Sequence, residues 1–145
     1  MRRRLPKTSE NIPLSGCANA GLSLTRGATM SKLVHFEITG RDSAALASFY
    51  ARQFGYSADP SPFVPDYHLL KADDGGVSGA VMPRTNKDQT VILWFEVADL
   101  DASLDAIVAA GGAVAGERNE IPGEGHVQYA ADPEGNIIGL KQPLL

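Results

Sequence analysis

The sequence predicts an α+β domain in which a strand–helix–strands unit occurs twice. Phe36-Glu37-Ile38 and Phe95-Glu96-Val97 are similar strand sequences, and each precedes an aspartate suited to cap a helix and then a glycine. Strand and helix periodicities also alternate through residues 31–142. Asp132-Pro133-Glu134-Gly135 has the residue order of a type I turn before a closing strand. A duplicated unit explains all three observations.

The first unit opens with a strand and a capped helix. Residues 33–39 alternate, so His35 and Glu37 face one way and Phe36 the other. Asp42 is a good N-cap, because its carboxylate can accept from the free N–H groups of the first turn. The helix extends to Phe54, where Gly55 provides the stop. The remainder is predicted as a proline-rich loop, a strand, a turn and a second strand, over residues 56–65, 66–72, 73–76 and 77–82.

The second unit repeats this order. Thr90–Val97 predicts a strand, and Asp99 or Asp101 caps a helix that ends at Gly111 and Gly112. The predicted elements after the helix are a short extended stretch, a loop, a strand and the closing strand, over residues 113–115, 117–125, 126–131 and 136–141.

Residues 1–29 differ from the rest of the chain. They lack periodicity and carry five basic residues against one acidic residue, whereas the whole chain has a net charge of −4. Met30 is followed directly by the first strand. Three interpretations are open: a start codon assigned too early, a disordered extension, or a transit peptide, whose usual composition is rich in Arg and poor in acids. The predicted domain is therefore residues 30–145, with units at about 31–84 and 89–142.

Composition excludes several functional classes. Residues 30–145 carry a net charge of −8, which disfavours a nucleic-acid surface. No segment is apolar for the roughly 20 residues that a membrane span needs. The single cysteine, Cys17, can form neither an internal disulfide nor a cysteine-based zinc site, so a cytoplasmic protein is expected. No serine-hydrolase, phosphate-loop or dinucleotide motif is present.

The combination of these segments resembles the vicinal oxygen chelate superfamily, which includes glyoxalases, bleomycin-resistance proteins and dioxygenases. The resemblance rests on Phe49-Tyr50 with Phe54-Gly55, on Gly76–Pro83, on Val97–Asp101 and on Asp132–Asn136. It implies two βαβββ modules that form a curled mixed sheet around a cavity, and it implies a homodimer. Many members of the superfamily hold a divalent metal there, while others bind a small molecule without chemistry.

The resemblance places metal ligands at four positions, on the first and last strand of each module. His35 occupies the first position. The second module offers Ile92 or Trp94 on its first strand and Gly139 on its last, and the first module closes with Ala80, Val81 or Met82. Because His and carboxylate side chains are the usual ligands, only His35 is retained, and we expect no metal. The expected function is direct binding of a small molecule, and the alternative is a metal-dependent lyase, isomerase or dioxygenase of the glyoxalase type.

Six residues are predicted to line the cavity. The turn at Asp132–Gly135 suggests a hairpin register in which Gln128 and His126 share a face with Gly139. The first strand adds His35 and Glu37, and the first strand of the second unit adds Trp94 and Glu96. Trp94 could stack on a flat ligand, and the acids would favour a cation. A histidine beside Glu37 could also form a general acid/base pair. Simpler interpretations remain open, with His35 as a structural histidine, the acids solvated, Trp94 in a core or dimer interface, and His126 on the surface.

Overall fold

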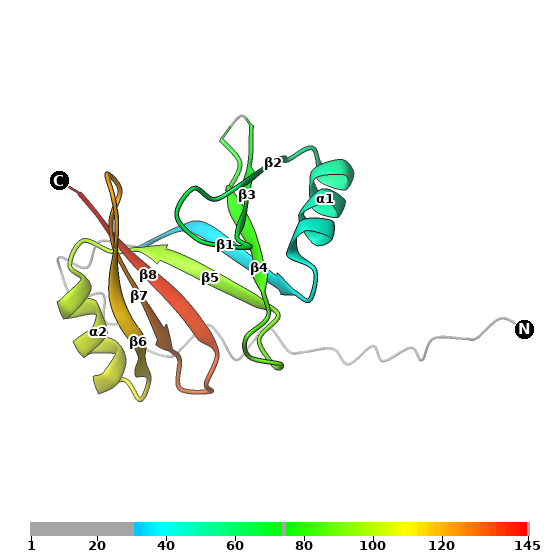
Figure 1. The fold of residues 1–145 in the computed structure, drawn as a ribbon. Helices are drawn as coiled ribbons and strands as arrows, with labels where there is room; N and C mark the ends of the chain where they lie inside the picture. Colours follow the sequence, from blue (N-terminus) through cyan, green and yellow to red (C-terminus); the bar gives the residue numbers. More distant parts are fainter. Residues whose placement is uncertain (1–30, 74, 145) are drawn as a thin grey trace, which may run out of the picture. The chain divides into compact units, whose positions relative to one another are not determined.

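The computed structural model describes residues 31–73 and 75–144, and the expectations for residues 1–29 lie outside this part. Its order of elements is a strand, a helix and three strands, followed by the same order again (Figure 1). Among these residues, no helix is both long and apolar enough to cross a membrane.

The first module contains β1 (Lys32–Gly40), α1 (Ser43–Phe54), β2 (Ser57–Pro60), β3 (His68–Lys71) and β4 (Gly79–Pro83). The carboxylate of Asp42 accepts from the backbone N–H of Ala45, as an N-cap does. The helix ends because Gly55 adopts a left-handed backbone conformation, with φ of 78°. The predicted helix boundaries of this module are therefore confirmed.

The second module contains β5 (Val91–Glu96), α2 (Leu100–Ala109), β6 (Ala113–Ile121), β7 (Gly125–Ala131) and β8 (Ile137–Pro143). Asp99, and not Asp101, caps α2, since its side chain accepts from the N–H of Ala102. Asp101 instead pairs with Arg118 of β6.

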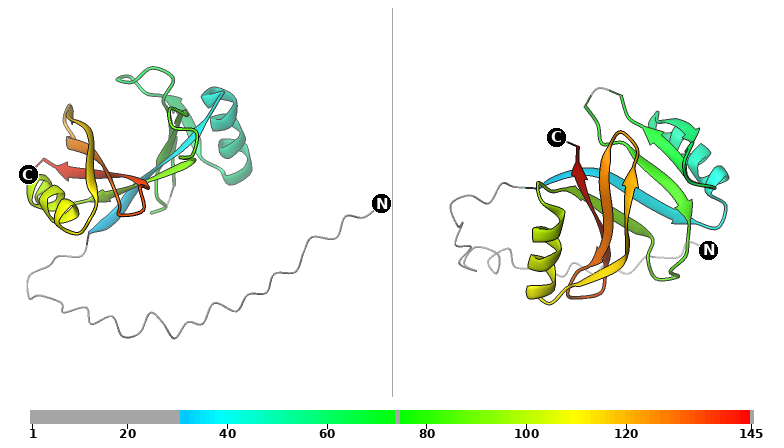
Figure 2. Two further views of the ribbon diagram at one scale, coloured as in Figure 1. Left: turned by 90° about the horizontal axis from the view of Figure 1, so that it is seen from below. Right: turned by 60° about the vertical axis from the view of Figure 1, so that its left-hand side comes forward.

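The eight strands form one mixed sheet in the order β2-β3-β4-β1-β5-β8-β7-β6. Within each module the first strand runs parallel to the last, as β1 does to β4 and β5 to β8. The modules join through the antiparallel pair β1 and β5 at the centre. The sheet curls, and the helices lie at its two ends on the outside (Figure 2). The predicted α+β fold of two βαβββ modules is confirmed.

The helices cover one face of the sheet, which we call the outer face. Leu70 and Val81 pack with Ala47 of α1, and Ala130 and Leu140 pack with Leu104 of α2. Because side chains alternate along a strand, the residues between these core positions point to the other, inner face. His35, Glu37, Trp94 and Gly139 belong to the inner face, which therefore presents the polar strand residues.

Two predicted loops contain strands. Ser57–Pro60 forms β2, since its one proline, Pro60, falls at the end of a strand at the sheet edge, where a missing donor is tolerated. β6 continues to Ile121 through residues predicted as loop, with an irregularity in its pairing to β7 between Ala115 and Asn119. Such an irregularity accommodates extra residues in one strand and hides the period-2 pattern.

Candidate functional site

A cavity of about 620 Å³ lies on the inner face. Its floor includes His35 and Trp94 from the central strands β1 and β5, and its walls include Tyr67 and Leu69 around β3 and Val127 of β7. The segment between β2 and β3 borders the opening with Phe63, whose side chain is 64% exposed. Both modules thus contribute to one space.

Glu37 lies beneath this floor and is only 2% exposed. Its Oε1 atom accepts from the indole Nε1 of Trp94 at 2.7 Å and from the hydroxyl of Tyr129 at 2.8 Å. The two rings meet edge to face, with centroids 4.9 Å apart. Glu37 is therefore not solvated. It is a buried acceptor that fixes the orientation of two aromatic rings.

His35 lies beside this group, where it contacts Tyr67 and meets the ring of Trp94 edge on. Its Nε2 atom lies 2.9 Å from the Tyr67 hydroxyl, and the two rings are stacked. Burial lowers the pKa of His35 below 6.5, although Glu37 acts in the opposite direction. Burial, followed by the charge of Glu37, raises the pKa of Tyr67. At neutral pH the imidazole is accordingly neutral and the phenol keeps its proton.

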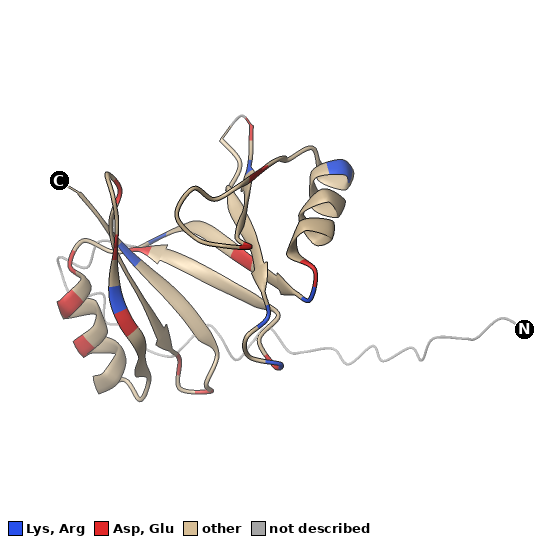
Figure 3. Cartoon of the chain, viewed as in Figure 1, with Lys and Arg blue, Asp and Glu red and all other residues tan. Residues whose placement is uncertain are grey.

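The opening of the cavity carries charges of both signs. Glu96 lines it beside Lys141, its neighbour in the β5–β8 pair. Lys141 forms an ion pair with Glu124 at 3.5 Å. Figure 3 shows Lys and Arg spread singly over several elements of the described chain. The cavity itself is bordered by more carboxylates than ammonium groups, since Asp59 and Lys71 also line it.

The predicted register of the last hairpin is wrong by one residue, and this moves two candidates out of the cavity. Tyr129 pairs with Gly139, so Gln128 pairs with Leu140 and His126 with Gln142, on the outer face. The amide of Gln128 donates to the backbone oxygens of Ala115 and Gly116. Gln128 therefore provides hydrogen-bond donors to the backbone oxygens in the irregular part of β6, which is a structural role.

The error has an identifiable cause in the turn. Asn136 belongs to the loop, because the carboxylate of Asp132 accepts from its backbone N–H at 2.9 Å and from its side chain at 2.8 Å. The backbone N–H of Asp132 in turn donates to the oxygen of Asn136. One additional loop residue shifts the register by one and reverses the face of every residue on β7.

Of the six candidates, His35, Trp94 and Glu96 line the cavity, and Glu37 supports its floor. Sequence reasoning missed Tyr67, Tyr129 and Lys141. Tyr67 precedes β3 at period-2 spacing from Leu69, which also lines the cavity, so this spacing was an available signal. Tyr129 had no such signal without the correct hairpin register.

The residues at the four metal positions of the resemblance do not fit a divalent ion. Trp94 of β5 pairs with His35 of β1 on one side and with Gly139 of β8 on the other. Ala80 of β4 pairs with Glu37 of β1. The indole of Trp94 occupies the space where a side chain at position 139 would stand, because a Cβ atom there would collide with the ring. In the described part of the chain, no three His, Cys, Asp or Glu side chains meet in a way that could hold a metal. The missing side chain of Gly139 therefore leaves no free space for a bound molecule, since the ring of Trp94 fills that space.

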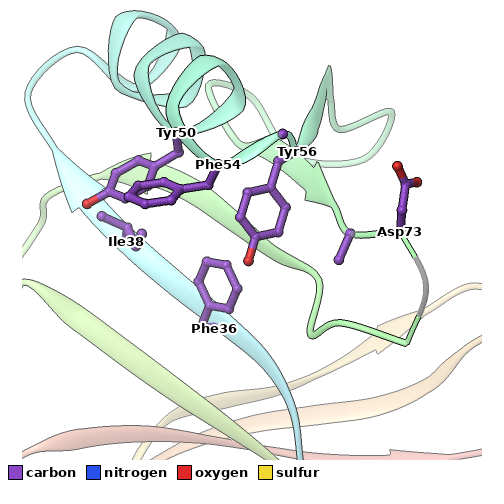
Figure 4. A pocket seen from close by; sticks show the side chains of 8 residues that line it. Phe36, Ile38, Tyr50, Phe54, Tyr56 and Asp73 are labelled. Atoms are coloured by element: carbon purple, nitrogen blue, oxygen red, sulfur yellow. The ribbon is translucent and has the colours of Figure 1, made fainter.

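A second hollow, of about 480 Å³, lies on the outer face between α1 and β1 (Figure 4). Phe36 and Ile38 of β1 face Tyr50 and Phe54 of α1 across it, with Tyr56 beside them. Phe36, Ile38, Tyr50 and Tyr56 also pack against the core of the first module. We assign this hollow to the packing of helix on sheet, because its one charged residue, Asp73, lies at the side.

Comparison with known proteins agrees with this architecture. The family model described as "Glyoxalase-like domain" matches residues 35–140. The curated proteins named "Putative glyoxylase CFP32" from Mycobacterium bovis and Mycobacterium tuberculosis are 31% identical over 109 residues, which is 73% of this chain. The chain spans 41% of the length of these relatives.

Similar solved structures share the fold at low sequence identity. The methylmalonyl-CoA epimerase of Mycobacterium tuberculosis has a TM-score of 0.60 at 17% identity, over 78% of this chain and 88% of the epimerase. A glyoxalase/bleomycin resistance protein/dioxygenase superfamily member from Vibrio splendidus has a TM-score of 0.58 at 16% identity, over 78% and 99%. These structures support the fold, and the family model covers most of the chain. The chain therefore belongs to the glyoxalase-like domain family.

Proposed function

We propose that the chain binds a small organic molecule in the inner-face cavity through direct contacts, without a divalent metal. One observation carries this proposal. The place of the fourth metal ligand is filled by the indole of Trp94, which is held there by the buried carboxylate of Glu37. A metal at this position would require both residues to move.

The cavity has the composition of a binding site for a mostly apolar ligand. Trp94, Leu69, Val127 and Phe63 offer apolar surface, and the pair of His35 and Tyr67 offers polar atoms. Ligand sites generally combine apolar walls with a few placed polar groups, in volumes of about 300–1,000 Å³. The volume of about 620 Å³ lies in this range.

The metal-dependent lyase, isomerase or dioxygenase remains the alternative, and the name of the mycobacterial relatives points toward it. The ligand positions described above do not support it for this chain. Direct binding also does not exclude chemistry, because a neutral imidazole beside a ligand can accept a proton.

The chain contains one tryptophan, so its fluorescence reports on the cavity alone. We would titrate the full chain with a library of planar, mostly apolar fragments and follow Trp94 emission, with thermal denaturation as a second measurement. Saturable changes that also raise the melting temperature are expected. Fragments that alter neither signal across the library would contradict the proposal.

We further propose that the chain forms a homodimer in a reducing cytoplasm and does not bind nucleic acid. Leu33, Val91 and Leu93 lie on the outer face of the central strands and are 44%, 44% and 41% exposed. The contacts of α1 and α2 are mainly with the other strands of each module. Apolar surface on the middle of a sheet is usually covered by another layer, which supports a second copy as the cover.

A further inference from the structure

Two separate hollows lie on the inner face of the sheet. One is the binding cavity described above, and the other is a smaller space of about 200 Å³, which we call the far hollow. The far hollow is lined by Ile92 of β5, Ile137 of β8 and Tyr129 of β7, among others. Among the described residues, none lines both spaces. The inner face is therefore divided between them.

The period of the strands shows where the division lies, because alternate residues of a strand share one face of a sheet. Three central strands pass from the binding cavity to the far hollow in steps of two residues. These steps are His35, Glu37 and Thr39 on β1, Glu96, Trp94 and Ile92 on β5, and Lys141, Gly139 and Ile137 on β8. The middle residue of each step lies at the boundary, and Tyr129 of β7 joins them because it pairs with Gly139.

The rings of Trp94 and Tyr129 form the partition at this boundary. Trp94 lines the binding cavity and Tyr129 lines the far hollow. The two rings meet edge to face, with centroids 4.9 Å apart. Gly139 permits this arrangement, because the indole occupies the space that a side chain at position 139 would need. Two aromatic rings in contact thus separate the two spaces.

Glu37 holds both rings in the partition. Its Oε1 atom accepts from the indole N–H of Trp94 and from the hydroxyl of Tyr129. Hydrogen bonds to a carboxylate are stronger than those between neutral groups, so neither ring turns away without losing a strong contact. Glu37 is 2% exposed, and a buried acceptor is not readily served by water instead. The partition is therefore a fixed wall.

The far hollow is suited to an apolar chain. Met82, Ile92 and Ile137 provide apolar surface. The hydroxyl of Thr39 donates to the backbone oxygen of Gln89 at 2.7 Å, and Oε1 of Gln89 accepts from the N–H of Ile137 at 3.0 Å. Because these polar groups are already engaged within the protein, an alkyl chain that entered the far hollow would meet mainly apolar surface.

We propose that Trp94 and Tyr129, positioned by Glu37, set the depth of the binding cavity, so that the chain takes compact ring-shaped ligands and excludes a linear chain running along the sheet. This ligand class rests on the proposed function of the cavity and adds a size limit to it. Trp94 limits the ligand by contact, since it lines the cavity. Glu37 is a positioning residue, because it acts through the two rings.

The size limit is tested with para-alkylphenols whose chains lengthen from methyl to octyl, by calorimetric titration of the full chain. Each buried methylene should tighten binding by about fourfold until the chain reaches the partition, and longer chains should gain nothing more. In Trp94→Ala the partition is open, so the gain should continue through further members of the series. The same length dependence in both proteins would overturn the proposal.

Two further variants locate the effect. Trp94→Phe loses the same N–H donor to Glu37 but keeps a ring, so affinity should stop rising at nearly the same chain length as in the wild type. Ala115→Phe, added to Trp94→Ala, places a ring in the far hollow and should abolish the extended gain. An extended gain in Trp94→Phe would mean that the lost hydrogen bond, and not the missing ring, is responsible. An extended gain that survives Ala115→Phe would mean that the alkyl chain does not enter the far hollow. Either result overturns the proposal.

The wild-type series also separates this proposal from the proposed function. If no alkylphenol binds, the binding cavity itself is contradicted, and the size limit with it. If the series binds and affinity rises over its whole length, the size limit is overturned while the binding cavity stands. This second outcome needs no substitution, so it remains decisive even if Trp94→Ala does not fold.

Discussion

The indole of Trp94 lies over Gly139 and occupies the space that any side chain at position 139 would need. The two residues are neighbours in the parallel pair of β5 and β8, and Glu37 holds the ring in place with a hydrogen bond of 2.7 Å. Gly139 and Trp94 therefore stand at two of the positions where the resemblance places metal ligands, and neither side chain can bind a metal.

This relationship predicts the effect of restoring a carboxylate. Gly139→Glu should destabilise the protein by about 1–3 kcal/mol, because the new side chain collides with the indole and the core must adjust. The measurement is urea unfolding, compared with Val114→Glu at an exposed strand position. The double change Trp94→His with Gly139→Glu should recover part of the stability and bind a divalent metal together with His35, as measured by mass spectrometry. A stable Gly139→Glu variant would show that Trp94 does not fill this space.

The buried carboxylate is predicted to stabilise the fold through its donors. Glu37→Leu leaves the N–H of Trp94 and the hydroxyl of Tyr129 without an acceptor, which should lower the free energy of unfolding by about 3 kcal/mol. Glu37→Gln keeps one acceptor oxygen and should cost about 1 kcal/mol. Urea unfolding followed by Trp94 fluorescence distinguishes the two variants. Similar losses in both would mean that charge, and not the hydrogen bonds, matters most.

The lowered pKa of His35 predicts a pH dependence of stability. Burial is the main cause and Lys141 adds to it, while Glu37 and Glu124 oppose it. The unfolded chain takes up the proton first as the pH falls, so this contribution is complete above the ordinary pKa of 6.5 and is lost below it. The loss of stability between about pH 7.5 and pH 5 should be larger in the wild type than in His35→Gln. An equal loss in both would contradict a neutral, buried imidazole.

The proposed dimer can be tested on the exposed strip at the centre of the sheet. Leu93→Lys places a charge on the outer face of β5 and should yield a monomer in light scattering after gel filtration. Val114→Lys, at a somewhat more exposed position on β6, should leave the dimer intact. A wild-type protein that is monomeric at all concentrations would refute the dimer.

Most of the fold could be predicted because it depends on local signals. Asp42 and Gly55 delimit α1 through their own backbone preferences, and the same holds for Asp99 at the start of α2. The site depends on register, which local signals do not determine. One residue in the loop, Asn136, decides that Tyr129 faces the cavity and that Gln128 and His126 do not.

Tyr67 illustrates a second limit of sequence reasoning. It follows a proline-rich segment, and its importance comes from its contact with His35, on a strand far away in the sequence. The fate of Glu37 was equally undetermined, because a strand acid is usually solvated. Only the positions of Trp94 and Tyr129 show that it is a buried acceptor.

The most direct test of the account is the metal content of the full chain, purified without a histidine tag and dialysed against a mixture of Ni, Zn, Mn and Fe. Mass spectrometry should find far less than one metal ion per chain in the wild type, with no difference from His35→Ala. A stoichiometric metal that is lost in His35→Ala would contradict the direct-binding cavity and would favour the metal-dependent enzyme.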